Sequence, residues 1–78
     1  MENNQIFRRL RYAFDLDDSE MIRIFKLAES DVSRSQISSW LKKDLDPEWK
    51  AVPDYRLATF LNGLINEKRG KKEGPQAP

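Results

Sequence analysis

The feature of this chain that most constrains its fold is a helix-start signal that occurs twice. Asp17 and Ser33 are residue types that cap helix N-termini, and Glu20 and Gln36 follow them at the spacing of a capping box. Each box is framed by two apolar residues spaced as a hydrophobic staple, Leu16 with Met21 and Val32 with Ile37. The sequence therefore predicts two helices in the middle of the chain, each with a defined first residue.

Apolar residues at helical intervals predict one further helix on either side of this pair. The first spans about residues 4–14, and its apolar residues are Ile6, Leu10, Ala13 and Phe14, with Phe7 on the flank. The last begins after Asp54, an expected N-cap, and ends before Gly70, an expected C′ residue. Its apolar face consists of Leu57, Ala58, Phe60, Leu61, Leu64 and Ile65. The third helix is expected to end at Asp44 or Leu45.

No segment has the alternating pattern of a strand, so the predicted fold class is all-α, a compact bundle of four main helices. Residues 1–70 are expected to form a single helical domain, followed by a flexible tail over residues 71–78. Asp46 before Pro47 is consistent with a short extra helical turn at that point. Gly63 lies inside the last helix, either because another backbone approaches it closely or without a packing role.

The composition removes several classes of function. The 78 residues include no His and no Cys, which removes the commonest general base and all thiolate chemistry. We therefore expect a protein that is not an enzyme and that uses no metal or cofactor. The 14 Lys and Arg residues nearly balance the 13 Asp and Glu residues, which disfavours strong nonspecific binding of nucleic acid. The absence of a long apolar run or signal peptide favours a cytoplasmic location without a membrane partner.

Four acidic residues close together in the sequence are interpreted as a turn and a helix cap. These residues are Asp15, Asp17, Asp18 and Glu20. They lack the Gly and the later bidentate Glu that a calcium-binding loop requires. Acidic residues are common at helix N-termini, so no metal site is predicted here.

The third predicted helix has an unusual composition. Its serines are mediocre helix formers, and Arg34 lies in the first turn, where the helix dipole disfavours a cation. Such local costs suggest a contact surface, although a solvated face is the simpler explanation of these serines. We interpret the two middle helices as a helix-turn-helix-like unit, whose second helix would enter the major groove. The predicted nucleic-acid-binding residues are Arg34, Ser35, Ser38, Ser39, Lys42 and Lys43.

Protein interaction or self-association is the alternative function. The turn before Ser33 lacks the Gly typical of a helix-turn-helix unit, and Glu29 and Asp31 would repel nearby phosphates. Trp49 lies in a loop flanked by prolines and is the candidate partner-binding residue, with burial in the core as its simpler role. The expected partners are therefore DNA or RNA, a second copy of the same helical unit, or another protein.

Three segments, 6–14, 36–43 and 60–70, carry a resemblance that covers nearly the whole chain. On these residues the chain resembles the YehS-like family of small bacterial proteins, a domain of unknown function. The resemblance implies a helical unit that occurs in two tandem copies, of which this sequence holds one, and it implies no functional residues. The chain is then either part of a tandem protein or a single-copy member. If it is part of a tandem protein, a face that packs against the sister copy is expected along the first or the last helix. Gly63 is expected to allow close packing, and Asn62 to bond to a loop.

Overall fold

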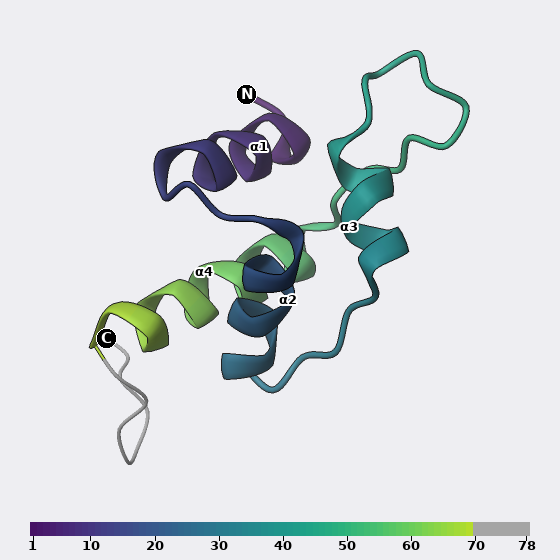
Figure 1. The fold of residues 1–78 in the computed structure, drawn as a ribbon. Coiled ribbons are helices and arrows are strands. Elements are labelled where there is room, and N and C mark those ends of the chain that lie inside the picture. Colours follow the sequence, from purple (N-terminus) through teal and green to yellow (C-terminus); the bar gives the residue numbers. More distant parts are fainter. Residues whose placement is uncertain (70–78) are drawn as a thin grey trace.

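Four α-helices form the part of the chain that the computed structural model describes, residues 1–69 (Figure 1). They are α1 (Asn3–Ala13), α2 (Asp18–Leu27), α3 (Arg34–Leu41) and α4 (Asp54–Arg69). Residues 1–69 contain no strand, so the predicted all-α bundle of four helices is confirmed. The expected C′ residue Gly70 and the expected flexible tail over residues 71–78 lie outside the described residues.

Both predicted capping boxes are present. The Glu20 backbone N–H donates to the Asp17 carboxylate at 2.8 Å, and the Asp17 N–H donates to the Glu20 carboxylate at 3.0 Å. Ser33 and Gln36 exchange the equivalent bonds at 2.9 and 3.1 Å. These reciprocal bonds satisfy N–H groups that have no partner within the helix, and so fix where α2 and α3 begin.

Aromatic rings fill the core between the helices. Phe7, Phe25 and Phe60 are fully buried, and the Phe60 ring centroid lies 5.1 Å from each of the other two. The observed buried face of α1 is therefore rotated relative to the predicted apolar face. Phe7 lies at its centre instead of on its flank, while Ala13 and Phe14 are exposed. The rotation arises because the Phe7 ring packs against the rings of Phe25 in α2 and Phe60 in α4.

The third helix ends earlier than predicted, at Leu41. Lys42 is the C-cap residue and is already extended, with φ −68° and ψ 163°. The chain turns away because the carbonyl of Ser39 accepts a hydrogen bond from the backbone N–H of Lys50 at 3.2 Å. Lys42 and Lys43 therefore lie beyond the helix on which they were predicted.

The segment over residues 42–53 projects at the edge of the molecule beyond α3 (Figure 1). It has two hydrogen-bonded turns where a short extra helical turn was expected. The N–H of Asp46 donates to Lys43 at 2.9 Å, and the N–H of Trp49 donates to Asp46 at 3.0 Å. The Asp46 carboxylate also accepts from the N–H of Glu48 at 2.8 Å, which stabilises a turn instead of a helix start.

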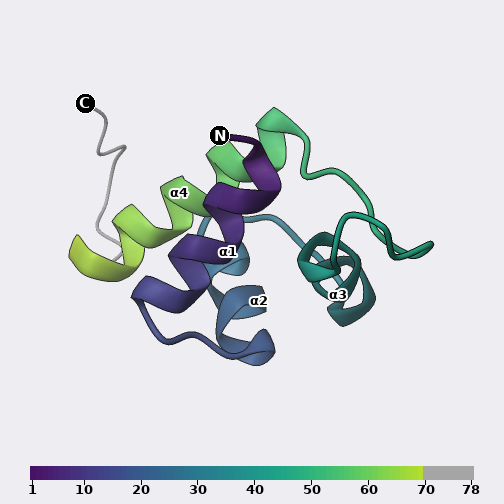
Figure 2. The same cartoon turned by 90° about the horizontal axis from the view of Figure 1, so that it is seen from above.

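Two expectations for α4 need correction. Asp54 is its first helical residue and not its N-cap, because the carbonyl of Pro53 accepts the first hydrogen bonds. Only part of the expected apolar face is buried. Phe60, Gly63 and Leu64 face the core, whereas Leu61 and Ile65 are 40% and 43% exposed. The view in Figure 2 shows α1 and α4 on one side of the molecule and α3 on the other.

Gly63 lies where the backbones of α2 and α4 approach each other closely. A Cβ placed on it would lie 2.8 Å from the carbonyl carbon of Ile24 and closer still to the carbonyl oxygen. The close backbone approach is therefore the correct explanation of this Gly. The amide that bonds across the same helix pair belongs to Asn66, which donates to the Leu27 carbonyl at 2.9 Å, while Asn62 is exposed.

An ion pair between α2 and α4 makes the stability of the fold depend on pH in the acidic range. Arg23 donates to Glu67 at 2.6 Å, and this hydrogen bond lowers the pKa of Glu67 from its ordinary value. Since the folded-state pKa is the lower one, the pair stabilises the fold above about pH 4.5, the ordinary pKa of Glu67. This stabilisation is lost as the pH falls through the folded-state pKa.

We expect Arg23→Gln to raise the pKa of Glu67 toward its ordinary value, because the donated hydrogen bond and the nearby positive charge are both removed. An NMR titration of the Glu67 side-chain carboxyl measures this shift directly. Lys26→Gln is the matched control, since Lys26 pairs with Asp31 and not with Glu67. A Glu67 pKa that is the same in Arg23→Gln and in the unmodified chain would contradict the assignment.

Candidate nucleic-acid interface

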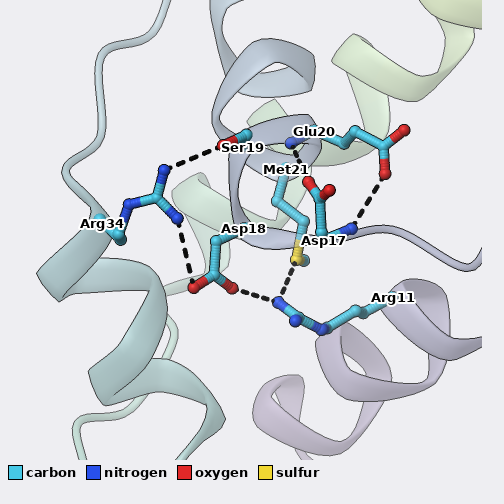
Figure 3. A network of polar contacts seen from close by, with 7 residues as sticks. All are labelled: Arg11, Asp17, Asp18, Ser19, Glu20, Met21 and Arg34. Atoms are coloured by element: carbon cyan, nitrogen blue, oxygen red, sulfur yellow. Dashed lines mark hydrogen bonds and ion pairs between the residues drawn. The ribbon is translucent and has the colours of Figure 1, made fainter.

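Arg34, the first residue of the predicted recognition helix, is bound within the molecule. Its guanidinium donates to the Ser19 hydroxyl at 2.9 Å and lies 3.6 Å from the Asp18 carboxylate (Figure 3). The same carboxylate accepts from Arg11 of α1 at 2.5 Å. Asp18 thus joins α1, α2 and the start of α3, and these contacts occupy part of the donor set that Arg34 could offer to a base.

The serines of α3 differ in what they can contact. Ser38 is exposed, and the hydroxyl of Ser35 lies 3.1 Å from that of the cap residue Ser33. Ser39 is half-buried, and its carbonyl accepts the backbone bond that ends the helix. Ser35 and Ser38 are therefore the serines of this helix whose side chains are open to a ligand.

The backbone that carries the lysines after α3 is hydrogen-bonded to Arg8 of α1. Lys43 is exposed, and the Lys42 ammonium is half-buried, 3.9 Å from the carboxylate of Glu48. The Lys42 carbonyl, which faces out of the terminated helix, accepts a hydrogen bond from Arg8 of α1 at 3.0 Å. This bond joins the Arg8 guanidinium to the backbone just before Lys43, although 34 residues separate Arg8 from Lys42 in the sequence.

Arg8 is one of a row of polar and aromatic side chains on the outer face of α1. Gln5, Arg8, Arg9 and Tyr12 line a shallow hollow on this face. Tyr12 is 88% exposed, and α1 contains three Arg residues and no acidic residue. Sequence reasoning missed these residues as site candidates. The available signal was that Arg8, Arg9 and Tyr12 lie opposite the apolar face of their helix.

The connection between α2 and α3 spans residues 28–33, longer than the roughly three- or four-residue turn of a helix-turn-helix unit. Glu29 has φ 60° and takes the left-handed conformation for which Gly would be favoured. The backbone N–H of Ser30 then donates to Phe25 at 3.0 Å and closes α2. Asp31 is paired with Lys26 at 2.7 Å. The helix-turn-helix interpretation stays a prediction.

Trp49 is half-buried, and its indole Nε1 is enclosed without a hydrogen-bond partner among residues 1–69. Most of this side chain therefore packs against the protein. Its assignment as a partner-binding residue stays a prediction.

The described part of the chain holds no group of three or more His, Cys, Asp or Glu residues arranged to bind a metal ion. The four acidic residues near the start of α2 have other roles. Asp17 and Glu20 form the capping box, and Asp18 binds the two arginines shown in Figure 3. Asp15 lies in the turn between α1 and α2, with φ 53°. Within residues 1–69, no helix is long and apolar enough to span a membrane.

Comparison with known proteins gives two matches. The model of a family described as "Protein of unknown function (DUF1456)" matches residues 3–70. The uncharacterized protein YehS of Escherichia coli (strain K12) is 39% identical over 77 residues, which are 99% of this chain and 49% of the relative. The chain thus spans about half the length of this curated relative. No solved structure matches the chain significantly.

Proposed function

The chain belongs to the DUF1456 family of proteins of unknown function, as its resemblance to YehS-like proteins indicated, and we propose that it binds nucleic acid without catalysing a reaction. The proposed contact surface, called the basic surface below, consists of Arg8, Arg9, Tyr12, Lys42 and Lys43. It replaces the start of α3 as the centre of the interface, because Arg34 is engaged by Asp18 and Ser19.

The observation that carries this proposal is the hydrogen bond from Arg8 to the Lys42 carbonyl. A guanidinium has five N–H donors, so one bond to a carbonyl leaves others free for phosphate oxygens. The bond holds the Arg8 cation next to the backbone that carries Lys42 and Lys43. Clustered cations raise the local positive potential even when the net charge of the whole chain is near zero.

Tyr12 supplies the second requirement of a nucleic-acid surface. This residue is 88% exposed and lines the same hollow as Arg8 and Arg9. Exposed aromatic rings next to cations serve as stacking platforms for unpaired bases, and such stacking contributes about 1–3 kcal/mol per base. The basic surface is therefore expected to favour a single strand over a duplex.

Fluorescence anisotropy with a labelled random-sequence single strand, and with the matching duplex, tests the proposal. We expect binding of the single strand at about 50 mM salt and much weaker binding at about 200 mM, because phosphate contacts release counterions. Lys43→Glu should weaken binding about tenfold, since it turns a phosphate contact into a repulsion. Tyr12→Ala should weaken single-strand binding about tenfold and leave duplex binding nearly unchanged.

Lys26→Glu is the matched control for Lys43→Glu, because it changes the net charge equally on α2, away from the basic surface. It should alter the affinity less than about twofold, as expected for a cation outside the contact surface. Equal losses in the two variants would show that only net charge matters. The absence of binding to both probes at the lower salt concentration would reject the proposed function.

A further inference from the structure

The outer face of α4 carries exposed apolar residues between two opposite charges. Asp54, Ala58, Leu61, Ile65 and Lys68 are all exposed. Their spacing of three or four residues places them in one stripe along the helix. We infer that this stripe, called the α4 stripe below, pairs in antiparallel orientation with the same stripe of a second copy of this chain.

The α4 stripe is separate from the face of the helix that packs in the core. Phe60, Gly63 and Leu64 are buried, with Gly63 directly against the Ile24 backbone. Leu61 and Ile65 remain 40% and 43% exposed, since they lie on the side of α4 turned away from α2. Nothing else among residues 1–69 covers these two side chains fully, so a partner that packs on them would bury further apolar surface.

Helix α1 holds both ends of the α4 stripe in place. The Asn3 amide donates to the Asp54 carboxylate at 2.6 Å, and the Lys68 ammonium lies 4.9 Å from the centroid of the Phe14 ring. These contacts connect the start of α1 with the start of α4, and the end of α1 with the end of α4. Phe14 is 41% exposed, and it adds apolar area beside Lys68.

The order of residues along the α4 stripe favours a second copy of the chain as the partner, in antiparallel orientation. From the N-terminus the stripe reads acidic, small, large, large, basic. In an antiparallel two-fold pair, Asp54 faces Lys68 of the second copy, Ala58 faces Ile65, and Leu61 lies near the axis. Each contact then occurs twice, as a two-fold interface requires.

A parallel pair would instead place Asp54 against Asp54 and Lys68 against Lys68, which is repulsive. The helix dipoles also favour the antiparallel arrangement.

A partner of the same size is consistent with the length of the YehS relative. That protein has about as many residues outside the match as within it, enough chain for a second unit. A chain of 78 residues has only a small core, and association is a common way for such domains to gain stability.

Sedimentation velocity of the full 78-residue chain, from low micromolar to near-millimolar concentration, tests the inference. We expect a concentration-dependent shift from monomer to dimer. Leu61→Glu should weaken the dimer by about 100-fold or more, because it places a charge near the two-fold axis in both copies. Leu45→Glu is the matched control, since Leu45 is 96% exposed in the loop after α3, and it should dimerise like the unmodified chain.

A charge-swap mixture tests the antiparallel register. Asp54→Lys and Lys68→Asp should each weaken self-association about tenfold, since each creates two like-charge pairs in a homodimer. An equimolar mixture of the two variants should associate again, because both pairs in the mixed dimer have opposite charges. Circular dichroism first verifies that each variant is folded.

Each outcome bears on the inference. A strictly monomeric unmodified chain at the highest concentration would overturn it, and so would a dimer that survives Leu61→Glu. A mixture that does not recover association would overturn the antiparallel register. The nucleic-acid titration uses different residues, so its failure would leave this result unaffected.

Discussion

The variant Gly63→Ala is expected to unfold about 1–2 kcal/mol more easily than the unmodified chain, although Ala is the better helix former. Helix propensity alone would stabilise the variant by about 1 kcal/mol. The added Cβ, however, would lie within 2.8 Å of the Ile24 carbonyl carbon, which belongs to the rigid backbone of α2. The two helices must move apart, which weakens the contact between the Phe25 and Phe60 rings. Overpacking of this kind costs about 1–3 kcal/mol or more, and here it exceeds the propensity gain.

Urea denaturation followed by circular dichroism measures the effect. Asn62→Ala is the matched control, because Asn62 is the preceding residue of the same helix and is exposed. That variant should be unchanged or slightly more stable, as helix propensity alone predicts. If Gly63→Ala were also stabilised by about 1 kcal/mol, the close approach of α2 and α4 at this point would be wrong.

The sequence predicts the starts of α2 and α3 well because their chemistry is local. Each box of α2 and α3 is complete within four residues, so Asp17 with Glu20, and Ser33 with Gln36, can be recognised without the fold. The equivalent bond at the start of α1, from the Glu2 N–H to Gln5 at 2.9 Å, went unpredicted. Glu is not a preferred cap residue, so this start gave no comparable signal.

The end of α3 and the buried side of α1 and α4 depend on contacts between distant residues. Local propensity continues α3 beyond Leu41, but a bond from Lys50 to Ser39 redirects the chain. The residues of the proposed basic surface also differ in what the sequence alone reveals about them. Lys42 and Lys43 were identified from their charge, whereas Arg8 is 34 residues away in sequence and joins them through a backbone carbonyl.

Asn4→Ala is expected to lower the free energy of unfolding by about 3–5 kcal/mol, because one buried amide satisfies three backbone groups. Its Nδ2 donates to the carbonyls of Trp40 at 3.1 Å and Lys50 at 2.8 Å. Its Oδ1 accepts from the N–H of Val52 at 2.9 Å. Asn4 is only 4% exposed, so water does not replace these bonds easily when the amide is removed.

Two variants separate hydrogen bonding from side-chain shape. Asn4→Asp keeps the shape and the bond from Val52 but cannot donate when ionised, so it should be at least as destabilising as Asn4→Ala. Asn66→Ala removes a half-buried amide with one bond, to the Leu27 carbonyl, and should cost only about 1 kcal/mol. Urea denaturation of the three variants gives the comparison. Equal losses in Asn4→Ala and Asn66→Ala would contradict the role assigned to Asn4.

The Asn4 bonds also fix the segment that carries the two lysines of the basic surface. Trp40 precedes this segment, and Lys50 and Val52 lie near its end, so one side chain of α1 holds both ends of the loop that contains Lys42 and Lys43. The Val52 amide should exchange its hydrogen slowly in the unmodified chain and much faster in Asn4→Ala, because its acceptor is removed. Binding of the single strand should weaken in the same variant even where it remains folded, since the lysines are no longer held beside Arg8. Unchanged exchange at Val52 would mean that other contacts fix the loop.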